Sequence, residues 1–399
     1  MISPTVEALS RWLDTAPNSE RSGDFRSIRL ERIAAFCRSL PPAPAPLSVV
    51  GTKGKGSTVR LVEAALVAGG YRTLAFTSPH VSSLLERWRC DGKPAQISAV
   101  VAAANEVAAR EGAVGGLSWF ERSWAIAWLL AGSRPGTLFL AEAGLGGRLD
   151  CVNATDAAVV ALTHLSHDHR EVLGPTLRHI AHEKLAVARP GRPLVIAPQS
   201  PAAREAITAK LPPGVTAVWV TAPAIPLPLA LLGAHQQDNA ATALAVLRHL
   251  APSLDPRTAL AGMATATLAA RCQLVPTSER TFLIDGAHNG PSVAATLAVA
   301  QARLIPGWTL VLGLATDKEV DEILAVIPAG TRVLRCGYVS PRARSRLQWP
   351  SAALDWPWFE RFADAMPNLP PGDVCVTGSF YLAGEVLGII DGSTINRAQ

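Results

Sequence analysis

The sequence lacks any uninterrupted apolar run long enough to cross a membrane, which takes about 18 residues. The best run, Trp124 to Leu130, is far too short. Residues 1–5 also lack the basic and then apolar order of a secretory signal peptide. We therefore expect a cytoplasmic protein with no attachment to a membrane.

Paired cysteines and concentrated charge are missing as well. The six cysteines stand at none of the spacings used in zinc or redox motifs, so we expect buried or incidental thiols in a reducing compartment. The net charge is +5, but lysine and arginine are scattered and form no basic stripe of the kind that binds nucleic acid. We expect no nucleic-acid partner.

With 399 residues the chain is too long for one ordinary core, and only 17% of its residues are charged, which indicates two globular domains. Continuous apolar runs alternate with helical patterns, which predicts parallel sheets covered by helices on both faces. The expected strands are 47–50, 73–76, 137–141, 157–162, 281–284, 309–312, 332–334 and 374–376. The expected helices are 5–40, 59–67, 118–132 and 239–250.

The stretch 193–232 is rich in proline and alanine, and its pattern fits strand and loop equally well. A second α/β series follows, and we place the boundary between the domains near residue 268. The predicted fold class is α/β. Residues 1–268 form an N-terminal P-loop-type parallel-sheet domain, and residues 269–399 form a smaller Rossmann-like α/β domain.

A glycine-rich loop between an expected strand and an expected helix is the strongest local signal. It reads Gly-Thr-Lys-Gly-Lys-Gly-Ser from Gly51 to Ser57. Glycines let successive backbone N–H groups turn toward one anion, and the helix N-terminus adds its positive dipole end. Lys55 can reach the outer phosphates of a nucleotide, and the Ser57 hydroxyl can ligate magnesium. Only two residues separate Gly51 from the Gly54-Lys55 pair, which favours ATP-dependent ligases over GTPases and kinases.

Three further polar sites follow expected strands, namely Ser78, Glu142 and Asp168-His169. In open parallel sheets the carboxyl ends of the strands form the ligand-binding edge, so we expect one shared rim. An acid at the end of an apolar strand is costly to bury unless it meets a cation such as magnesium. The alternatives are that Glu142 caps nearby glycine amides and that His169 is an ordinary hydrogen-bonding residue.

Lys184 lies on the apolar stripe of an expected helix that begins at Gly174-Pro175, with proline at the first helical position. The simple interpretation is that its ammonium snorkels outward to water. The alternative is that burial lowers its pKa, so that the neutral amine takes up carbon dioxide. A carbamate would turn this cation into an anion that binds metal.

Taken together, these motifs resemble folylpolyglutamate and dihydrofolate synthases of the Mur ligase superfamily over roughly residues 28–390. The matching motifs, in chain order, are Leu30-Glu31-Arg32-Ile33, Gly51 to Ser57, Thr77 to His80, Glu86-Arg87 with Arg89, Phe120-Glu121, Glu142 to Asp150, Asn153, Asp168-His169, Leu173-Gly174, Glu183-Lys184, Gly233 to Gln236, Asn239-Ala240, Arg271, Asp285 to Asn289, Asp317-Lys318 and Gly378-Ser379. Lys53 departs from the asparagine that is common in bacterial relatives, although lysine occurs in others.

The resemblance implies ATP and magnesium as cofactors, with folate or dihydropteroate and L-glutamate as substrates of a monomeric ligase. It implies that the nucleotide is held by Gly51, Thr52, Gly54, Lys55, Gly56, Ser57, Asn239, Arg271, Asp285 and His288. It implies one magnesium among Ser57, Ser78 and Glu142, and a second among Glu142, His169 and a carbamylated Lys184. The catalytic set would then be Lys55, Glu142, His169 and Lys184.

Three other functions stay open from the sequence. A related ligase could use the same ATP chemistry to join a different amino acid to a different acid. A nucleotide-binding regulator without turnover would not need the full set of phosphate and metal residues. A GTPase or kinase is disfavoured by the loop spacing and by the second α/β domain.

Overall fold

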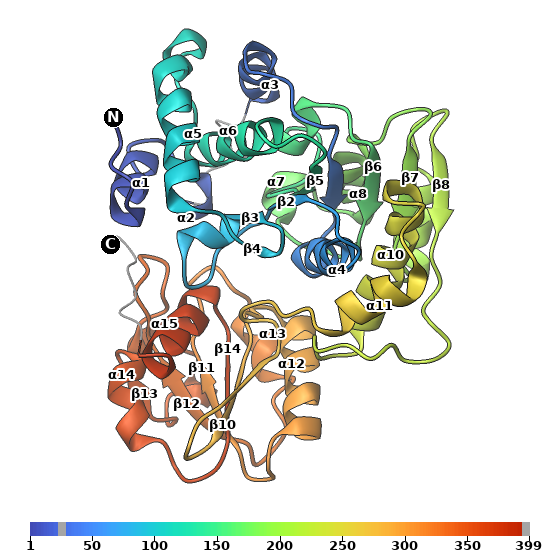
Figure 1. Cartoon of the computed structure of the whole chain (residues 1–399). Coiled ribbons are helices and arrows are strands. Elements are labelled where there is room, and N and C mark those ends of the chain that lie inside the picture. The colour runs from blue at the N-terminus through green and yellow to red at the C-terminus, as the bar shows by residue number, and fades with distance from the viewer. Residues whose placement is uncertain (23–28, 393–399) are drawn as a thin grey trace.

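The computed structural model describes residues 1–22 and 29–392 and has two lobes, each built on its own β-sheet (Figure 1). The N-terminal lobe runs from α1 to α11 and contains an eight-stranded sheet. The C-terminal lobe runs from β9 to α15 and contains a six-stranded sheet. The predicted α/β class is confirmed.

The N-terminal sheet has the strand order β4-β3-β2-β5-β1-β6-β7-β8. Its strands are β1 (Leu47–Val50), β2 (Thr73–Phe76), β3 (Trp88–Cys90), β4 (Lys93–Pro94), β5 (Leu138–Glu142), β6 (Val159–Leu162), β7 (Pro193–Ile196) and β8 (Thr216–Trp219). The six strands other than β3 and β4 run parallel.

The N-terminal sheet is parallel, as expected, except at one edge, where β3 and β4 are antiparallel and were not predicted. Asp91 and Gly92 join these two strands and both have positive φ, at 51° and 78°. This is the geometry of a type I′ hairpin turn, which Asp-Gly favours. A two-residue connection cannot make the crossover that a parallel pair needs.

The helices of this lobe cover both faces of its sheet, as expected. They are α1 (Val6–Leu13), α2 (Ser19–Ser22), α3 (Leu30–Ser39), α4 (Lys55–Ala68), α5 (Ile97–Arg110), α6 (Trp119–Gly132), α7 (Arg170–Leu173), α8 (Leu177–Leu185), α9 (Pro201–Thr208), α10 (His235–Leu250) and α11 (Pro256–Ala264). Successive strand residues point to opposite faces of the sheet and so contribute to two separate cores. Phe76 and Phe139 pack with α6 on one face, and Val49 and Leu140 pack with α4 on the other.

Two helix predictions need correction. The range 5–40, expected to be helical, contains three separate helices, α1, α2 and α3, and residues 23–28 of it lie outside the described part of the chain. The stretch 193–232 contains β7 and β8 but also a helix, α9, that the sequence analysis missed. The missed signal is Ser200-Pro201, because serine caps the helix and proline occupies its first turn.

The C-terminal sheet has the order β13-β12-β11-β14-β10-β9, and only β9 runs antiparallel to its neighbour. Its strands are β9 (Gln273–Pro276), β10 (Thr281–Ile284), β11 (Thr309–Leu312), β12 (Arg332–Cys336), β13 (Trp358–Phe359) and β14 (Val374–Thr377). Its helices are α12 (Gly290–Arg303), α13 (Val320–Leu324), α14 (Phe362–Ala365) and α15 (Phe380–Ile390). Four of its strands match the predicted ranges closely.

No helix in residues 1–22 or 29–392 combines the length and the apolar character that a membrane span requires. All six cysteines are free thiols, and all except the half-buried Cys90 are buried. The expectation of unpaired thiols is therefore confirmed.

We predict that Trp124→Ala destabilises the N-terminal lobe by about 3–5 kcal/mol, the usual cost of truncating a buried tryptophan. Trp124 is fully buried, with its ring centroid 5.7 Å from that of Phe76 and 5.4 Å from that of Phe139. Urea unfolding followed by near-UV circular dichroism measures the change. Ile225→Ala is the control, because Ile225 is 79% exposed and its loss should change stability by less than about 0.5 kcal/mol.

Candidate active site

The glycine-rich loop lies between β1 and α4, and its glycines are required by close packing. Gly51 has φ 149°, and a Cβ added there would lie 1.9 Å from the Oγ1 of Thr163. Gly54 has φ 89°, and an added Cβ would lie 2.2 Å from the Oδ1 of Asn239. The Thr52 amide donates to the carbonyl oxygen of His164 at 2.9 Å. The loop is therefore clamped between the segment after β6 and helix α10.

The strands that carry the expected polar residues are neighbours in the sheet, in the order β2-β5-β1-β6. Their carboxyl ends form one continuous edge, which brings Ser78, Glu142 and the loop together. The Ser78 amide donates to the Oε2 of Glu142 at 3.0 Å. An added Cβ at Gly56 would lie 3.2 Å from the same oxygen, so the start of α4 contacts Glu142 directly.

Glu142 is a carboxylate in an environment that disfavours its charge. It is 4% exposed, and burial raises its pKa while the Lys55 ammonium and the Ser78 amide only partly oppose the shift. The amide that it accepts from belongs to a serine, so the proposed capping of glycine amides does not describe this contact. A divalent cation beside Glu142 would favour its ionised form. The buried Ser57, whose hydroxyl could help to bind such a cation, lies in the first turn of α4.

Lys184 is buried, which excludes the interpretation that its ammonium snorkels to water and agrees with the burial that the alternative requires. It is 4% exposed, and its Nζ donates to the carbonyl oxygen of Gly51 at 2.8 Å. Burial, and secondly the nearby Lys55 charge, lower its pKa to about 7. The expected helix entry at Gly174-Pro175 was also wrong, because α8 begins at Leu177 with Thr176 as its N-cap.

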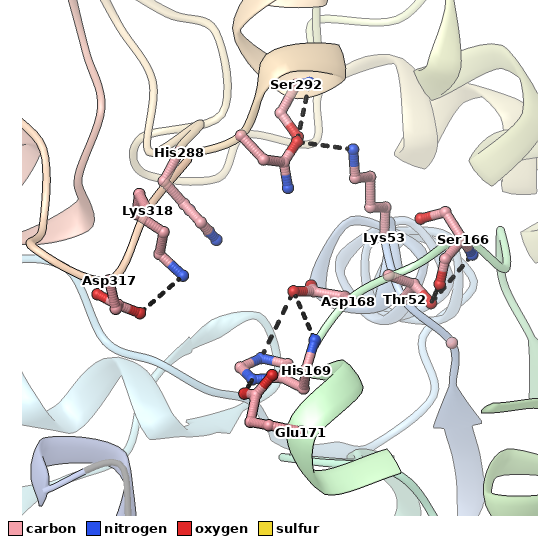
Figure 2. A network of polar contacts seen from close by, with 12 residues as sticks. Thr52, Lys53, Ser166, Asp168, His169, Glu171, His288, Ser292, Asp317 and Lys318 are labelled. Atoms are coloured by element: carbon pink, nitrogen blue, oxygen red, sulfur yellow. Dashed lines mark hydrogen bonds and ion pairs between the residues drawn. The ribbon is translucent and has the colours of Figure 1, made fainter. Parts of the chain in front are cut away.

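His169 sits beside two acids at the same edge of the sheet. Its ring nitrogens lie 3.9 Å from an oxygen of Asp168 and 3.8 Å from an oxygen of Glu171 (Figure 2). Burial lowers its pKa, and Asp168 opposes that shift. In the described part of the chain no three His, Cys, Asp or Glu residues form a ready metal site. The two expected magnesium sets each rely on serine or lysine as well, and they stay predictions.

The C-terminal lobe presents its own polar groups to this edge. Asp285 follows β10 and accepts from the amides of Cys272 at 2.6 Å and Ala287 at 2.7 Å. The Nδ1–H of His288 donates to the carbonyl oxygen of Gly286 at 2.9 Å. The Arg271 guanidinium lies 4.3 Å from the ring centroid of Phe380. Asn239, also expected to contact the nucleotide, is buried beside Gly54 in the N-terminal lobe.

The two lobes face each other across a network that includes residues without an assigned role in the sequence analysis. His288 and Lys318 of the C-terminal lobe lie opposite Asp168 and His169 of the N-terminal lobe (Figure 2). Burial alone would raise the pKa of Asp168, but nearby cationic groups, chiefly His169 and His288, hold it below its usual range. Lys318 was recognised only as part of a motif, because nothing in its local pattern shows which strand end it would face.

Asp150 is a second residue whose importance only the structure shows. It is buried and accepts from the amides of Leu145 at 3.0 Å and Val152 at 3.1 Å. Burial nevertheless raises its pKa to about 6. It holds the turn after Glu142 in shape, and it belongs to the motif noted in the sequence without a role of its own.

Comparison with known proteins relates the whole chain to one group of enzymes. Dihydrofolate synthase/folylpolyglutamate synthase of Escherichia coli K12 is 32% identical over 413 aligned residues, which cover 96% of both chains. The chain belongs to the folylpolyglutamate synthase/dihydrofolate synthase family. The Mycobacterium tuberculosis member is 31% identical over 74% of this chain and 71% of its own. No protein-family model matches the sequence.

Solved structures of this family share the fold. Mycobacterium tuberculosis folylpolyglutamate synthase complexed with ADP and AMPPCP has a TM-score of 0.83 at 27% identity, covering 96% of this chain and 98% of that one. The E. coli enzyme FolC in complex with DHPP and ADP has a TM-score of 0.82 at 28% identity, with the same coverage. A bifunctional family member with Mn, AMPPNP and L-glutamate bound has a TM-score of 0.81 at 27% identity, again covering 96% and 98%.

We predict that Gly54→Ala weakens nucleotide affinity by at least about tenfold, because the methyl group would collide with Asn239 in a backbone conformation that alanine resists. Gly70→Ala is the matched control, since Gly70 has φ 78° and nothing within 4 Å of an added Cβ. Isothermal titration with an ATP analogue and magnesium measures both affinities. Equal affinities in the two variants would show that packing of the loop against α10 is not needed for binding.

We predict that Lys184→Met removes a pH dependence of stability in the metal-free, unmodified protein. The folded-state pKa of Lys184 is lowered to about 7, so between about pH 7 and pH 10.5 the unfolded chain binds more protons than the folded chain. The stability of the unaltered protein should therefore rise with pH through this window relative to the Met variant. Below about pH 7 the difference should be constant. Denaturant unfolding in chelator and carbonate-free buffer measures it, and parallel pH profiles would contradict it.

Proposed function

We propose that this protein is an ATP-dependent ligase that joins L-glutamate to the carboxylate of a folate through an acyl phosphate. The observation that carries the proposal is the single sheet edge at which the glycine-rich loop, Glu142 and Lys184 meet. Family members bind the matching molecules: ADP with DHPP in one structure, and AMPPNP with Mn and L-glutamate in another.

The chemistry explains why a ligase needs this edge. A carboxylate is a poor acylating agent, so one of its oxygens first attacks the terminal phosphorus of ATP, and ADP leaves. The amine of glutamate then attacks the acyl carbon, and phosphate leaves as the amide bond forms. Lys55 and the amides of the loop neutralise the charge on the transferred phosphoryl group. The facing C-terminal lobe shields the acyl phosphate from hydrolysis by water.

The metal assignments follow from the donors present. Magnesium, when bound, neutralises phosphate charge and orients the phosphoryl oxygens. We assign one ion to Ser57, Ser78 and Glu142, because a divalent cation would favour the ionised form of this buried carboxyl group. We assign a second ion to Glu142, His169 and a carbamylated Lys184. A carbamate nitrogen keeps one N–H, so carbamylation is compatible with the bond from Lys184 to Gly51.

Other parts of the assignment rest on position in the fold. The nucleotide base lies toward Asn239, and Arg271, Asp285 and His288 complete its site from the C-terminal lobe. We also propose a boundary between the two domains near residue 268 and a monomeric protein in the cytoplasm, neither of which follows from the position of the site residues. Dihydropteroate is a second acid substrate, because the E. coli relative carries both synthase names.

Mass analysis of products formed from ATP, glutamate and either tetrahydrofolate or dihydropteroate tests the proposal. We expect each acid to gain the mass of one or more glutamyl residues, with release of phosphate. A related ligase with other substrates would leave both acids unchanged, and a regulator without turnover would release no phosphate with any acid.

Lys55→Ala and Glu142→Gln should each reduce ligation by at least about a hundredfold, because each removes a charge that the phosphoryl transfer needs. Far-UV circular dichroism should show an intact fold in both variants. Lys210→Ala is the control, since Lys210 is an exposed lysine of the same lobe. Turnover near that of the unaltered protein in either site variant would refute the assignment.

A further inference from the structure

Lys53 of the glycine-rich loop makes a direct bond to the opposite lobe. Its Nζ donates to the Oδ1 of Asn289 at 3.0 Å, although the two residues are 236 positions apart (Figure 2). The backbone of Lys53 is itself fixed, because its amide donates to the carbonyl oxygen of His164. The bond therefore joins a rigid part of the N-terminal lobe to the C-terminal lobe.

The acceptor is also rigid. Asn289 is the N-cap of α12, and its Oδ1 accepts from the amide of Ser292 at 3.1 Å and from the Ser292 hydroxyl at 2.7 Å. These two bonds fix the position of the oxygen from within the C-terminal lobe, independently of Lys53. Lys53 is thus tied to the first turn of α12, and His288 is the residue that directly precedes the cap.

The Lys53 ammonium has further bonding capacity. An ammonium group has three N–H donors, and the bond to Asn289 uses one. Burial lowers the pKa of Lys53, and the Asp168 carboxylate opposes that shift. The amide oxygen of Asn289 carries no formal charge, so it compensates the cation less well than an anion does. Lys53 belongs to the loop that turns its amides toward a phosphate, between Thr52 and Gly54. An anion in that loop would meet the two donors that remain.

We propose that Lys53 is a positioning residue that binds a nucleotide phosphate and Asn289 at the same time, so that an occupied loop holds α12 and His288 over the nucleotide. The proposal rests on the proposed function only for the location of the nucleotide. It assigns to Lys53 a different task from Lys55, whose Nζ lies 3.4 Å from the Gly51 oxygen within its own lobe. Binding energy from the phosphate is thereby used to order the two lobes.

A double-mutant cycle tests this coupling. Lys53→Met removes the ammonium but keeps most of the side-chain length. Asn289→Ser keeps a good N-cap residue for α12 but is too short to meet Lys53. The measured quantity is the dissociation constant of AMPPNP with magnesium in the unaltered protein, both single variants and the double variant.

We expect each single variant to weaken binding roughly two- to tenfold, as is usual for residues in direct contact. Asn289→Ser should then have no further effect once Lys53 is methionine. Lys53→Arg should restore much of the affinity, because a guanidinium also offers several N–H donors. Hydrogen exchange of the α12 amides should slow on nucleotide binding in the unaltered protein and much less in Lys53→Met.

Two results would overturn the proposal while leaving the proposed function intact. The first is that Asn289→Ser changes the dissociation constant by the same factor whether position 53 is lysine or methionine. That result would show that the two residues act independently. Tighter binding in Asn289→Ser would show that the phosphate and Asn289 compete for the ammonium. Failure of the unaltered protein to bind the nucleotide would instead refute the proposed function together with this inference. Lys210→Met controls for the loss of one positive charge from the N-terminal lobe.

Discussion

The carbonyl oxygen of Gly51 is the point around which the active site is arranged. It accepts a hydrogen bond from Lys184 at 2.8 Å and lies 3.4 Å from the Nζ of Lys55. The chain can present this oxygen only because Gly51 has a backbone conformation and a close contact with Thr163 that exclude a side chain. Two lysines are therefore held close together, and the charge of one of them, Lys55, acts on the buried carboxyl group of Glu142.

This arrangement concentrates charges that are unfavourable until other charges join them. Burial raises the pKa of Glu142 and lowers that of Lys184, so burial disfavours the charged form of each group. In the proposed function, a nucleotide phosphate and divalent metal supply the missing charges. Burying such groups lowers the free energy of unfolding, and in the proposed function the favourable interactions with bound substrate offset that loss. A site built in this way is preorganised for phosphoryl transfer.

The local signals in the sequence predicted most of the sheet strands and the phosphate loop, because both depend on residues that are adjacent in the chain. An apolar run of four residues such as 281–284 forms a buried strand in almost any α/β context, and a glycine-rich turn before a helix binds anions by backbone geometry alone. The errors came where a short-range signal was overlooked, as with Asp91-Gly92 and Ser200-Pro201. The helical pattern over 5–40 did not show the breaks between α1, α2 and α3, because helical periodicity does not show where a chain turns between helices.

Sequence alone determined which residue types could do the chemistry: a loop that cradles phosphate, an acid at the end of a strand, and a lysine on an apolar stripe. It also determined the family, because the order of many motifs is recorded directly in the chain. Only the tertiary structure decided which strands are neighbours, whether Lys184 faces water or the loop, and that Lys53 meets Asn289 in the other lobe. Strand order, burial and contacts between lobes arise from packing among residues that are far apart in the chain, up to 236 positions for Lys53 and Asn289. No local pattern encodes those contacts.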